Sequence, residues 1–376
     1  MLGERIRLAR LAARMTLREL ADKVGVTAQA ISKYETGKDM PRQSVLLRLA
    51  DATKVNTAYL LHPMTVKLHE VEFRKRANLP AKEQQAVRSL VIDRLEKYLE
   101  VEAMFEPERS PGYDLPDAVR SPVRAPDEVE DRADALRKYW TLGDDPIESV
   151  VEMLEDHGAK VVMTEADRRF DELAGFANEK YPVVVVKEGE DMPPDRQRFD
   201  ALHGFGHLAL TFGPGIDKER MCHRFAAAVL APKFAAFREL GRQRTNLDLQ
   251  HELLILKAKY GMSVAAWIFR AKDLRIITPT TFQKLYRQLG ALGWRKKEKN
   301  PPEWDHCMPC EKPRRFELLV RQALAEGRIG PAKAADLLGE QPSPRIRRPS
   351  DEELRSAAQA AAAESQKDEW DDFVGD

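Results

Sequence analysis

Two histidines four residues apart are the feature that most constrains this chain. They lie in the stretch R-F-D-A-L-H-G-F-G-H-L-A-L, residues 198–210, whose apolar residues recur at helical spacing. On a helix, His203 and His207 share one face one turn apart, so both imidazoles can reach a single divalent metal ion. Gly204 and Gly206 lie between them, and each costs a helix about 1 kcal/mol relative to alanine. The sequence therefore predicts a helix that carries two metal ligands.

The nearest general motif for such a pair is H-E-x-x-H, in which a glutamate accepts a proton from metal-bound water. Gly204 occupies the glutamate position here, so the catalytic base is missing and no residue of this chain is predicted to be catalytic. A zinc site of this type needs a third protein ligand. Glu219, which starts a second predicted helix over residues 217–230, is the candidate, and Cys222 and His223 share its face as substitutes or supports.

Length and composition predict two or three domains. With 376 residues, 43% hydrophobic and 32% charged, the chain can bury more than one core. No apolar run reaches the roughly 18 residues that span a bilayer, and the first ten residues are charged where a signal peptide is apolar. Three cysteines are too few for a disulfide framework. We therefore expect a cytoplasmic protein with no membrane partner.

The formal net charge is zero, but the charges are unevenly distributed. Residues 1–62 hold eleven Lys and Arg against six Asp and Glu, whereas residues 351–376 hold two against nine. The basic N-terminal part indicates a polyanionic partner. We expect residues 341–376 to form a disordered acidic tail.

Residues 1–62 predict an all-α helix-turn-helix domain. Thr16 can cap a second helix with Glu19 at the capping-box position, Gly25 ends that helix, and Thr27 caps a third helix that ends near Thr36. A first helix is expected over residues 2–15, and helices over residues 42–53 and up to Leu61 bring the number to five.

The third helix of this motif lies in the major groove of double-stranded DNA. Ile31 and Tyr34 are expected to face the core. Gln29 is the best candidate to read a base, and Lys33 or Lys38 would contact phosphate. The full set of predicted DNA-binding residues is Thr27, Ala28, Gln29, Ser32, Lys33 and Lys38.

Residues 63–128 are predicted to form a helical linker. A long charged helix is expected over about residues 81–104, with one apolar face that serves either as a seam in a homodimer or as a strut between domains. Five prolines between Pro107 and Pro126 indicate a flexible boundary.

The remainder predicts an α+β domain over residues 129–275 and a helical C-terminal region over residues 276–340. Two strands are expected, at residues 160–163 and 181–187. Helices are expected at residues 131–139, 146–157, 282–293 and 315–326, with a further turn after Ile329. His306, Cys307 and Cys310 provide half of a zinc knuckle at most, and an incidental loop is the better interpretation.

Two stretches of the chain also resemble known families. T-L-R-E-L-A-D-K-V-G-V-T-A-Q-A-I-S-K-Y-E-T-G-K resembles the XRE (Cro/repressor) family, which implies that Glu35 is structural and pairs with an arginine, for which Arg10 is the candidate. The histidine stretch together with E-R-M-C-H-R-F-A-A-A-V-L-A-P resembles the ImmA/IrrE family of zinc metallopeptidase domains. That resemblance implies a zincin-like fold and zinc ligands at His203, His207 and Glu219, with the family's catalytic glutamate replaced by Gly204.

Three hypotheses for function follow. We favour a DNA-binding transcriptional regulator whose zinc-binding domain acts as a sensor or partner platform, without peptidase activity as the sequence stands. The second is a zinc endopeptidase that cleaves a repressor or partner protein, which requires Glu at position 204 in the native gene. The third is an antitoxin or regulatory partner in a toxin–antitoxin or phage-defence system. Whether the chain is an enzyme thus depends on position 204.

Overall fold

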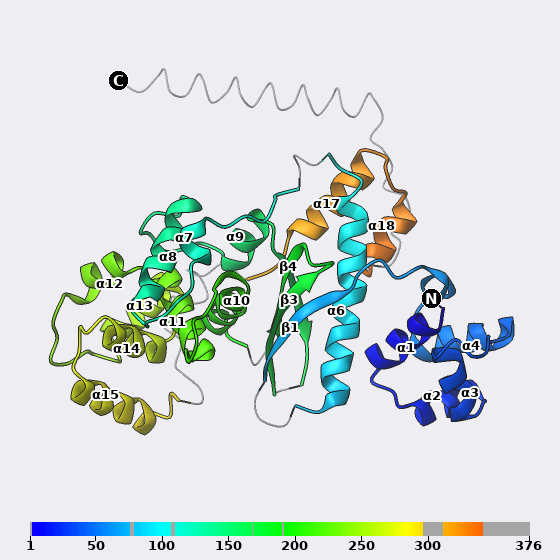
Figure 1. Cartoon of the computed structure of the whole chain (residues 1–376), viewed down its shortest axis with the longest axis horizontal. Helices are drawn as coiled ribbons and strands as arrows, with labels where there is room; N and C mark the ends of the chain where they lie inside the picture. The colour runs from blue at the N-terminus through cyan, green and yellow to red at the C-terminus, as the bar shows by residue number, and fades with distance from the viewer. Residues whose placement is uncertain are drawn as a thin grey trace, which may run out of the picture. The chain divides into compact units, whose positions relative to one another are not determined.

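The computed structural model describes residues 2–75, 79–106, 110–167, 169–189, 192–295 and 311–340 (Figure 1). An all-α N-terminal domain is followed by an α+β region and a helical C-terminus, as the sequence predicted. The predicted acidic tail and the residues His306, Cys307 and Cys310 lie outside the described ranges. Among the described residues no helix is both long enough and apolar enough to cross a membrane.

The N-terminal domain contains helices α1 (Leu2–Ala12), α2 (Leu17–Val24), α3 (Ala28–Glu35), α4 (Gln43–Thr53) and α5 (Thr57–Leu61). Thr16 and Glu19 form the predicted capping box, and Gly25 ends α2 in the left-handed conformation. Gly3 allows α1 to approach the end of α3, because a Cβ at this position would lie 2.4 Å from the carbonyl oxygen of Tyr34. The domain has its own apolar core, which includes Ile6, Leu20, Ile31 and Leu49.

A four-stranded mixed sheet forms the centre of the α+β region. The strands are β1 (Leu68–Lys75), β2 (Lys160–Glu165), β3 (Phe170–Ala177) and β4 (Tyr181–Glu188), in the order β1-β3-β4-β2. β3 is antiparallel to β1 and to β4, whereas β2 is parallel to β4. The sequence predicted β2 and β4, but β1 and β3 were missed.

The prediction of a helical linker over residues 63–128 was therefore incomplete. β1 lies in this range and is the edge strand of the same sheet, next to β3. The proline-rich segment is not a flexible boundary where it is described either. Val119 on α7 (Asp117–Arg120) and Val123 are fully buried in the main core, and Val123 forms a β-bridge to Phe212.

One face of the sheet is covered by α6 (Ala81–Glu102), the long helix that the sequence predicted. Val87, Val91 and Leu95 of α6 pack with Leu173 and Val185 in a second apolar core. Figure 1 shows α6 on one side of the sheet and α10 on the other. Since the apolar face of α6 is covered by the chain's own sheet, it is not available as the seam of a homodimer.

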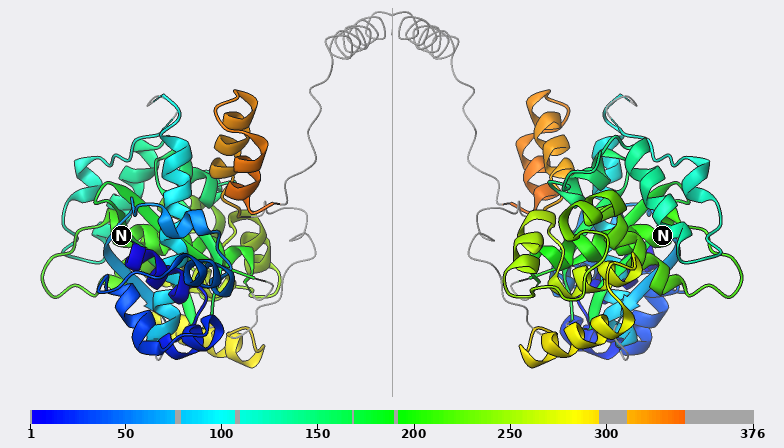
Figure 2. Two further views of the ribbon diagram at one scale, coloured as in Figure 1. Left: turned by 90° about the vertical axis from the view of Figure 1, so that its right-hand side faces the viewer. Right: turned by 90° about the vertical axis from the view of Figure 1, so that its left-hand side faces the viewer.

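The opposite face of the sheet packs against α10 (Pro194–Ala209). Val184 and Val186 of β4 share the main core with Leu202 and Phe205 of that helix. Further helices lie on the same side of the sheet as α10 (Figure 1 and Figure 2). They are α8 (Glu128–Tyr139), α9 (Val150–Asp156), α11 (Lys218–Leu230), α12 (Lys233–Leu240), α13 (Glu252–Tyr260), α14 (Val264–Asp273) and α15 (Pro279–Ala291).

The C-terminal region contains α17 (Arg315–Ala325) and α18 (Pro331–Leu338). Gly330 precedes Pro331, which lies in the first turn of α18. Backbone N–H groups in the first turn have no hydrogen-bond partner within the helix, so a proline, which has no N–H, is well tolerated there. Arg321 and Glu340 form an ion pair of 2.6 Å within this region. The predicted helices at residues 315–326 and after Ile329 are confirmed.

Candidate metal centre and DNA-contacting helix

Helix α10 brings His203 and His207 to one face, as their spacing predicted. The helix starts after Pro193 with Pro194 in its first turn and packs closely on α11. Gly206 makes that close packing possible, because a Cβ there would lie 3.2 Å from Cδ1 of Phe225 on α11. The side chain of His203 is fully buried, and that of His207 is 5% exposed.

Glu219, in the first turn of α11, completes a three-ligand cluster. Its Oε2 lies 3.4 Å from Nε2 of His203, and its Oε1 lies 3.4 Å from Nε2 of His207. One ligand atom from each residue lies within 4.8 Å of the other two. The structure therefore brings together all three residues that the sequence predicted as ligands.

The donor set fits a zinc ion. Zinc binds imidazole nitrogens and carboxylate oxygens at about 2.0–2.2 Å, so neighbouring ligand atoms of a tetrahedral site lie about 3.3 Å apart. The nitrogen-to-oxygen separations of 3.4 Å agree with this spacing. Three protein ligands also leave a fourth position open, as in zinc sites that bind water or an exogenous group.

Two carboxylates support the histidines from behind, and neither was predicted from the sequence. Glu172 on β3, 2% exposed, hydrogen-bonds with Nδ1 of His203. Glu72 on β1, 49% exposed, places Oε2 2.6 Å from Nδ1 of His207. The hydrogen bond to Glu172 favours the His203 tautomer in which Nε2 is free to bind metal, whereas Glu72 makes a close charge contact with His207 without a hydrogen bond. A strand from the supposed linker therefore contributes to the metal centre.

The electrostatics favour the protonation states that a metal requires. Contact with His203, and the charge of the nearby imidazoles, lower the pKa of Glu219 to about 2. Burial, followed by the charge of His203, lowers the pKa of His207. An ionised carboxylate beside an imidazole that resists protonation is ready to bind a cation at neutral pH.

Cys222 and His223, which the sequence offered as substitutes for Glu219, have other roles. Cys222 is buried in the core, and burial raises the pKa of its thiol far above the ordinary value. Nδ1 of His223 is 2.6 Å from the carbonyl oxygen of Glu219, one turn earlier. The His223 ring lies against that of His203, with 4.4 Å between ring centroids. His223 therefore borders the cluster, and Glu219 supplies the ligand atom.

Gly204 leaves the position of the catalytic base without a side chain. A Cβ built at this residue would lie 3.5 Å from Oε1 of Glu172 and 3.5 Å from Cγ1 of Val184, which are ordinary van der Waals contacts. The backbone at position 204 therefore has room for a Cβ atom. Glu172 cannot replace the missing base, because it contacts the opposite ring nitrogen of His203 from the one that faces Glu219.

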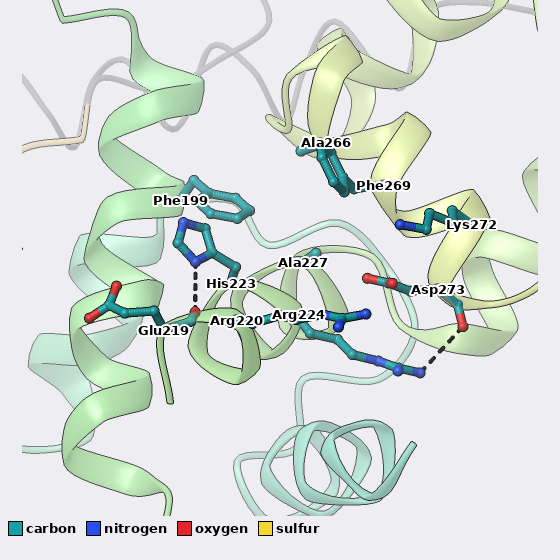
Figure 3. Close-up of a pocket in the computed structure, with 10 residues that line it drawn as sticks. All are labelled: Phe199, Glu219, Arg220, His223, Arg224, Ala227, Ala266, Phe269, Lys272 and Asp273. Carbon is teal, nitrogen blue, oxygen red and sulfur yellow. Dashed lines mark hydrogen bonds between the residues drawn. The ribbon is translucent and has the colours of Figure 1, made fainter. Parts of the chain in front are cut away.

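A cavity of about 540 Å³ adjoins Glu219 on α11 (Figure 3). Phe199 of α10 and several residues of α14 form its other walls, and His223 points into it. The metal centre thus borders a space that an exogenous molecule can enter.

The predicted DNA-contacting residues lie on or near α3. Gln29, Lys33 and Lys38 are exposed, and Ser32 is half-buried. Thr27 is exposed and caps α3 by accepting the N–H of Ala30 at 3.1 Å. Ala28 is half-buried, and part of it packs against the domain core.

Arg10 and Glu35 form the bidentate pair that the family resemblance implied. Nε of Arg10 lies 2.6 Å from Oε1 of Glu35, and Nη2 lies 2.8 Å from Oε2. Arg5 also has partners within the protein, since its guanidinium donates hydrogen bonds to the carboxylate of Glu96 and the carbonyl oxygen of His62. Part of the positive charge of residues 1–62 is therefore structural, which leaves exposed cations such as Lys33, Lys38 and Arg42 for an anionic partner.

Comparison with known families agrees with both halves of this description. A family model described as a helix-turn-helix matches residues 6–60, and a model described as an IrrE N-terminal-like domain matches residues 154–272. No curated protein and no solved structure gives a significant match. The first match supports a DNA-binding regulator, and the second supports a metallopeptidase-like domain. The chain is a fusion of an XRE-type helix-turn-helix domain with an IrrE-like domain of the ImmA/IrrE metallopeptidase family.

Proposed function

We propose that this chain is a DNA-binding transcriptional regulator whose IrrE-like domain binds zinc and acts as a sensor or partner platform without peptidase activity. Gly204 is the observation that carries the proposal. The ligands His203, His207 and Glu219 converge, while the residue between the histidines that would accept a proton from water has no side chain. A missing general base costs such an enzyme about 10²- to 10⁴-fold in rate.

The DNA-binding half of the proposal rests on α3. Its exposed face carries Gln29 and Lys33, with Lys38 just beyond its end, and its opposite side is fixed to the core by Ile31 and to α1 by the Arg10–Glu35 pair. A rigid helix with an amide and a cation on its outer face, and a second cation just beyond its end, suits the major groove of double-stranded DNA. Such a regulator works where the genome lies, in the cytoplasm.

Zinc, when bound at this centre, would supply a Lewis acid and an electrostatic anchor for an anionic or carbonyl group. The chain's own residues hold the ligands in place. Glu172 orients the imidazole of His203, the Glu72 carboxylate lies close to the imidazole of His207, and Glu219 stays ionised. The arrangement favours capture of a ligand at the open coordination position over turnover.

The peptidase hypothesis gives a direct test at position 204. We expect the chain to leave unstructured casein and a random-sequence peptide library intact in the presence of zinc. Gly204→Glu should create zinc-dependent cleavage, because a Cβ fits at this position and the carboxylate restores the missing proton acceptor. Gly204→Gln is the matched control, since it has the same shape but cannot accept the proton. Cleavage by the unaltered chain that His207→Ala abolishes would refute the proposal.

A further inference from the structure

A second hollow lies at the C-terminal end of α15, and it shares no lining residue with the cavity beside Glu219. Its volume is about 520 Å³, and its lining consists of Arg287, Gly290, Gly293 and Arg295. α15 packs on α14 and lies at the edge of this group of helices (Figure 1). Both arginines are exposed, so the hollow presents two guanidinium groups to solvent.

Two glycines shape the hollow and leave space for Arg295 against the helix. A Cβ at Gly290 would lie 3.0 Å from Nε of Arg295 and 3.1 Å from its Cζ, so the missing side chain lets the guanidinium lie close to the helix. Gly293, with a φ of +74°, adopts the left-handed conformation that is typical of a helix end. Nη2 of Arg295 donates a hydrogen bond to the carbonyl oxygen of Tyr286 at 2.8 Å, and Cζ lies 4.2 Å from the centroid of the Tyr286 ring. Arg295 is therefore held in one orientation before a ligand binds, which lowers the entropy cost of binding.

No carboxylate neutralises the two arginines within the part of the chain that the structure describes. Nε of Arg287 donates a hydrogen bond to the carbonyl oxygen of Gln283 at 3.3 Å, so each guanidinium uses one N–H group on the backbone and keeps others for a ligand. The lining of the hollow contains no acidic residue. Asp273, at the end of the adjacent α14, is not a counter-ion here, because the cations that act most strongly on its charge lie on α11 and α14. The hollow therefore carries a net positive charge.

The positive charge continues along the exposed face of α15. Residues 274–295 contain four Lys and Arg and no Asp or Glu. Lys284 is exposed and lies about one turn before Arg287, and the exposed amides of Gln283 and Gln288 lie beside these two cations. The face therefore presents a row of cations and hydrogen-bond donors, which suits successive phosphates along a polymer better than it suits one small anion.

The side chains of the hollow match a phosphate group. A planar guanidinium contacts two phosphate oxygens at once, with two parallel N–H donors. The lining has no aromatic or aliphatic side chain against which a nucleobase or an acyl chain would pack, which favours a phosphodiester backbone over a nucleotide or a lipid. Since the same chain carries a helix-turn-helix domain, the backbone that it meets is that of double-stranded DNA.

We propose that the exposed face of α15 binds the phosphate backbone of double-stranded DNA, as a contact separate from α3. Arg287 and Arg295 bind phosphate at the hollow, and Lys284 binds a neighbouring phosphate. The contact reads no base, so it adds affinity for every sequence. The proposal rests on the proposed function in taking the chain to bind DNA, but it uses none of the residues 1–62.

Salt-dependent binding of the full chain to a random-sequence duplex tests the proposal. Arg287→Gln/Arg295→Gln should weaken binding about fivefold or more at about 0.1 M salt and lower the salt slope by about two, because two phosphate contacts are lost. Lys233→Gln/Arg242→Gln is the matched control, since it removes the same charge from two exposed positions outside α15. The control should change the affinity less than about twofold, because salt screens charges that do not touch the DNA.

A variant that fills the hollow without changing the charge separates an organised site from diffuse attraction. Gly290→Leu places a side chain where the Arg295 guanidinium lies, and it should weaken binding about threefold or more. Ala291→Leu, at the next residue but outside the lining, should leave binding unchanged. Arginines that only offset the dipole at the end of a helix would give no effect on DNA binding in either variant. Thermal melts show whether each variant is folded, and if Gly290→Leu unfolds, the exposed arginine variants still decide.

The proposal is overturned if the double arginine variant keeps the affinity and salt slope of the parent chain, if the Lys233/Arg242 control loses as much, or if a folded Gly290→Leu variant binds as the parent does. Lys33→Ala/Lys38→Ala, measured on the same duplex, keeps this proposal apart from the assignment of α3. A loss confined to that α3 variant would sink only the α15 contact, whereas a loss confined to the arginine variant would sink only the α3 assignment.

Discussion

Glu172 on β3 and His203 on α10 share a buried hydrogen bond between a carboxylate oxygen and Nδ1 of the imidazole. Nδ1–H donates this hydrogen bond to the carboxylate, which leaves the Nε2 lone pair directed towards Glu219. The sheet therefore sets the tautomer of the first metal ligand, and the metal centre depends on β3 as well as on the two helices that carry the ligands.

Glu172→Gln should weaken zinc binding by about tenfold, because the amide can present its NH₂ group to Nδ1 and so favour the wrong tautomer. Competition titrations against a chelator of known affinity measure this change. Glu72→Gln is the control, and its effect should be smaller because Glu72 is half-exposed. Unchanged affinity in the Glu172 variant would show that the hydrogen bond does not position His203.

The two glycines of α10 should respond in opposite ways to alanine. Gly204→Ala should raise the free energy of unfolding by up to about 1 kcal/mol, since the new Cβ makes ordinary contacts and the helix gains intrinsic propensity. Gly206→Ala should not stabilise the protein, because its Cβ would meet Phe225 at 3.2 Å and Cys222 at 3.4 Å. Chemical denaturation of both variants gives the comparison, and equal stabilisation would mean that α10 and α11 are free to move apart.

Two variants on the outer face of α3 should affect DNA binding in different ways, one through phosphate contact and the other through recognition of a base. Lys33→Ala should weaken binding to every DNA sequence and reduce the salt slope by about one, because one phosphate contact is lost. Gln29→Ala should chiefly relax base preference at one position, which sequence selection from a random duplex library reveals. Equal losses on selected and random DNA for both variants would refute the role of Gln29.

Glu155 should make stability depend on pH. Burial raises the pKa of this carboxyl group from 4.5 to about 7, so the folded protein holds a proton that the unfolded chain has already released. Its stabilising contribution is therefore complete below about pH 4.5 and is lost as the pH rises to about 7.

Glu155→Gln should remove that part of the pH dependence, since the amide stays neutral. Urea denaturation measures the free energy of unfolding at each pH. Its decrease between pH 5 and pH 7.5 should be smaller in the variant than in the parent chain. Glu152→Gln on the same helix is the control, because no comparable burial affects it. A variant with the same slope as the parent would mean that Glu155 is ionised throughout this range.

The sequence was sufficient for features that depend on neighbouring residues. The capping box of Thr16 and Glu19, the left-handed Gly25 and the one-turn spacing of His203 and His207 are local patterns, and each is present in the structure. The position of Glu219 near the two histidines also followed from the sequence, because it lies in the first turn of a helix that begins shortly after the end of α10 in the chain.

The missed features depend on partners distant in sequence. In β1, Val71 and Phe73 alternate with Glu70, Glu72 and Arg74, which is the period-two pattern of a half-buried strand that the prediction of a linker overlooked. β3 has no such pattern, because it buries two acidic residues whose partners lie on α10. Asp171 pairs with Arg196, and Glu172 with His203. The supporting carboxylates could be recognised only once the sheet placed both strands beside the helix.

Zinc content of the purified full chain tests the central claim most directly. After growth with zinc and purification without chelators, elemental analysis should find about one zinc ion per chain, because three protein ligands converge independently of position 204. Gly204→Glu should carry the same amount, and His207→Ala should carry none. Zinc at about one per chain in the first two proteins and absent from the third is the predicted result. A parent chain without zinc, or a His207→Ala variant that retains it, would contradict the proposed metal centre.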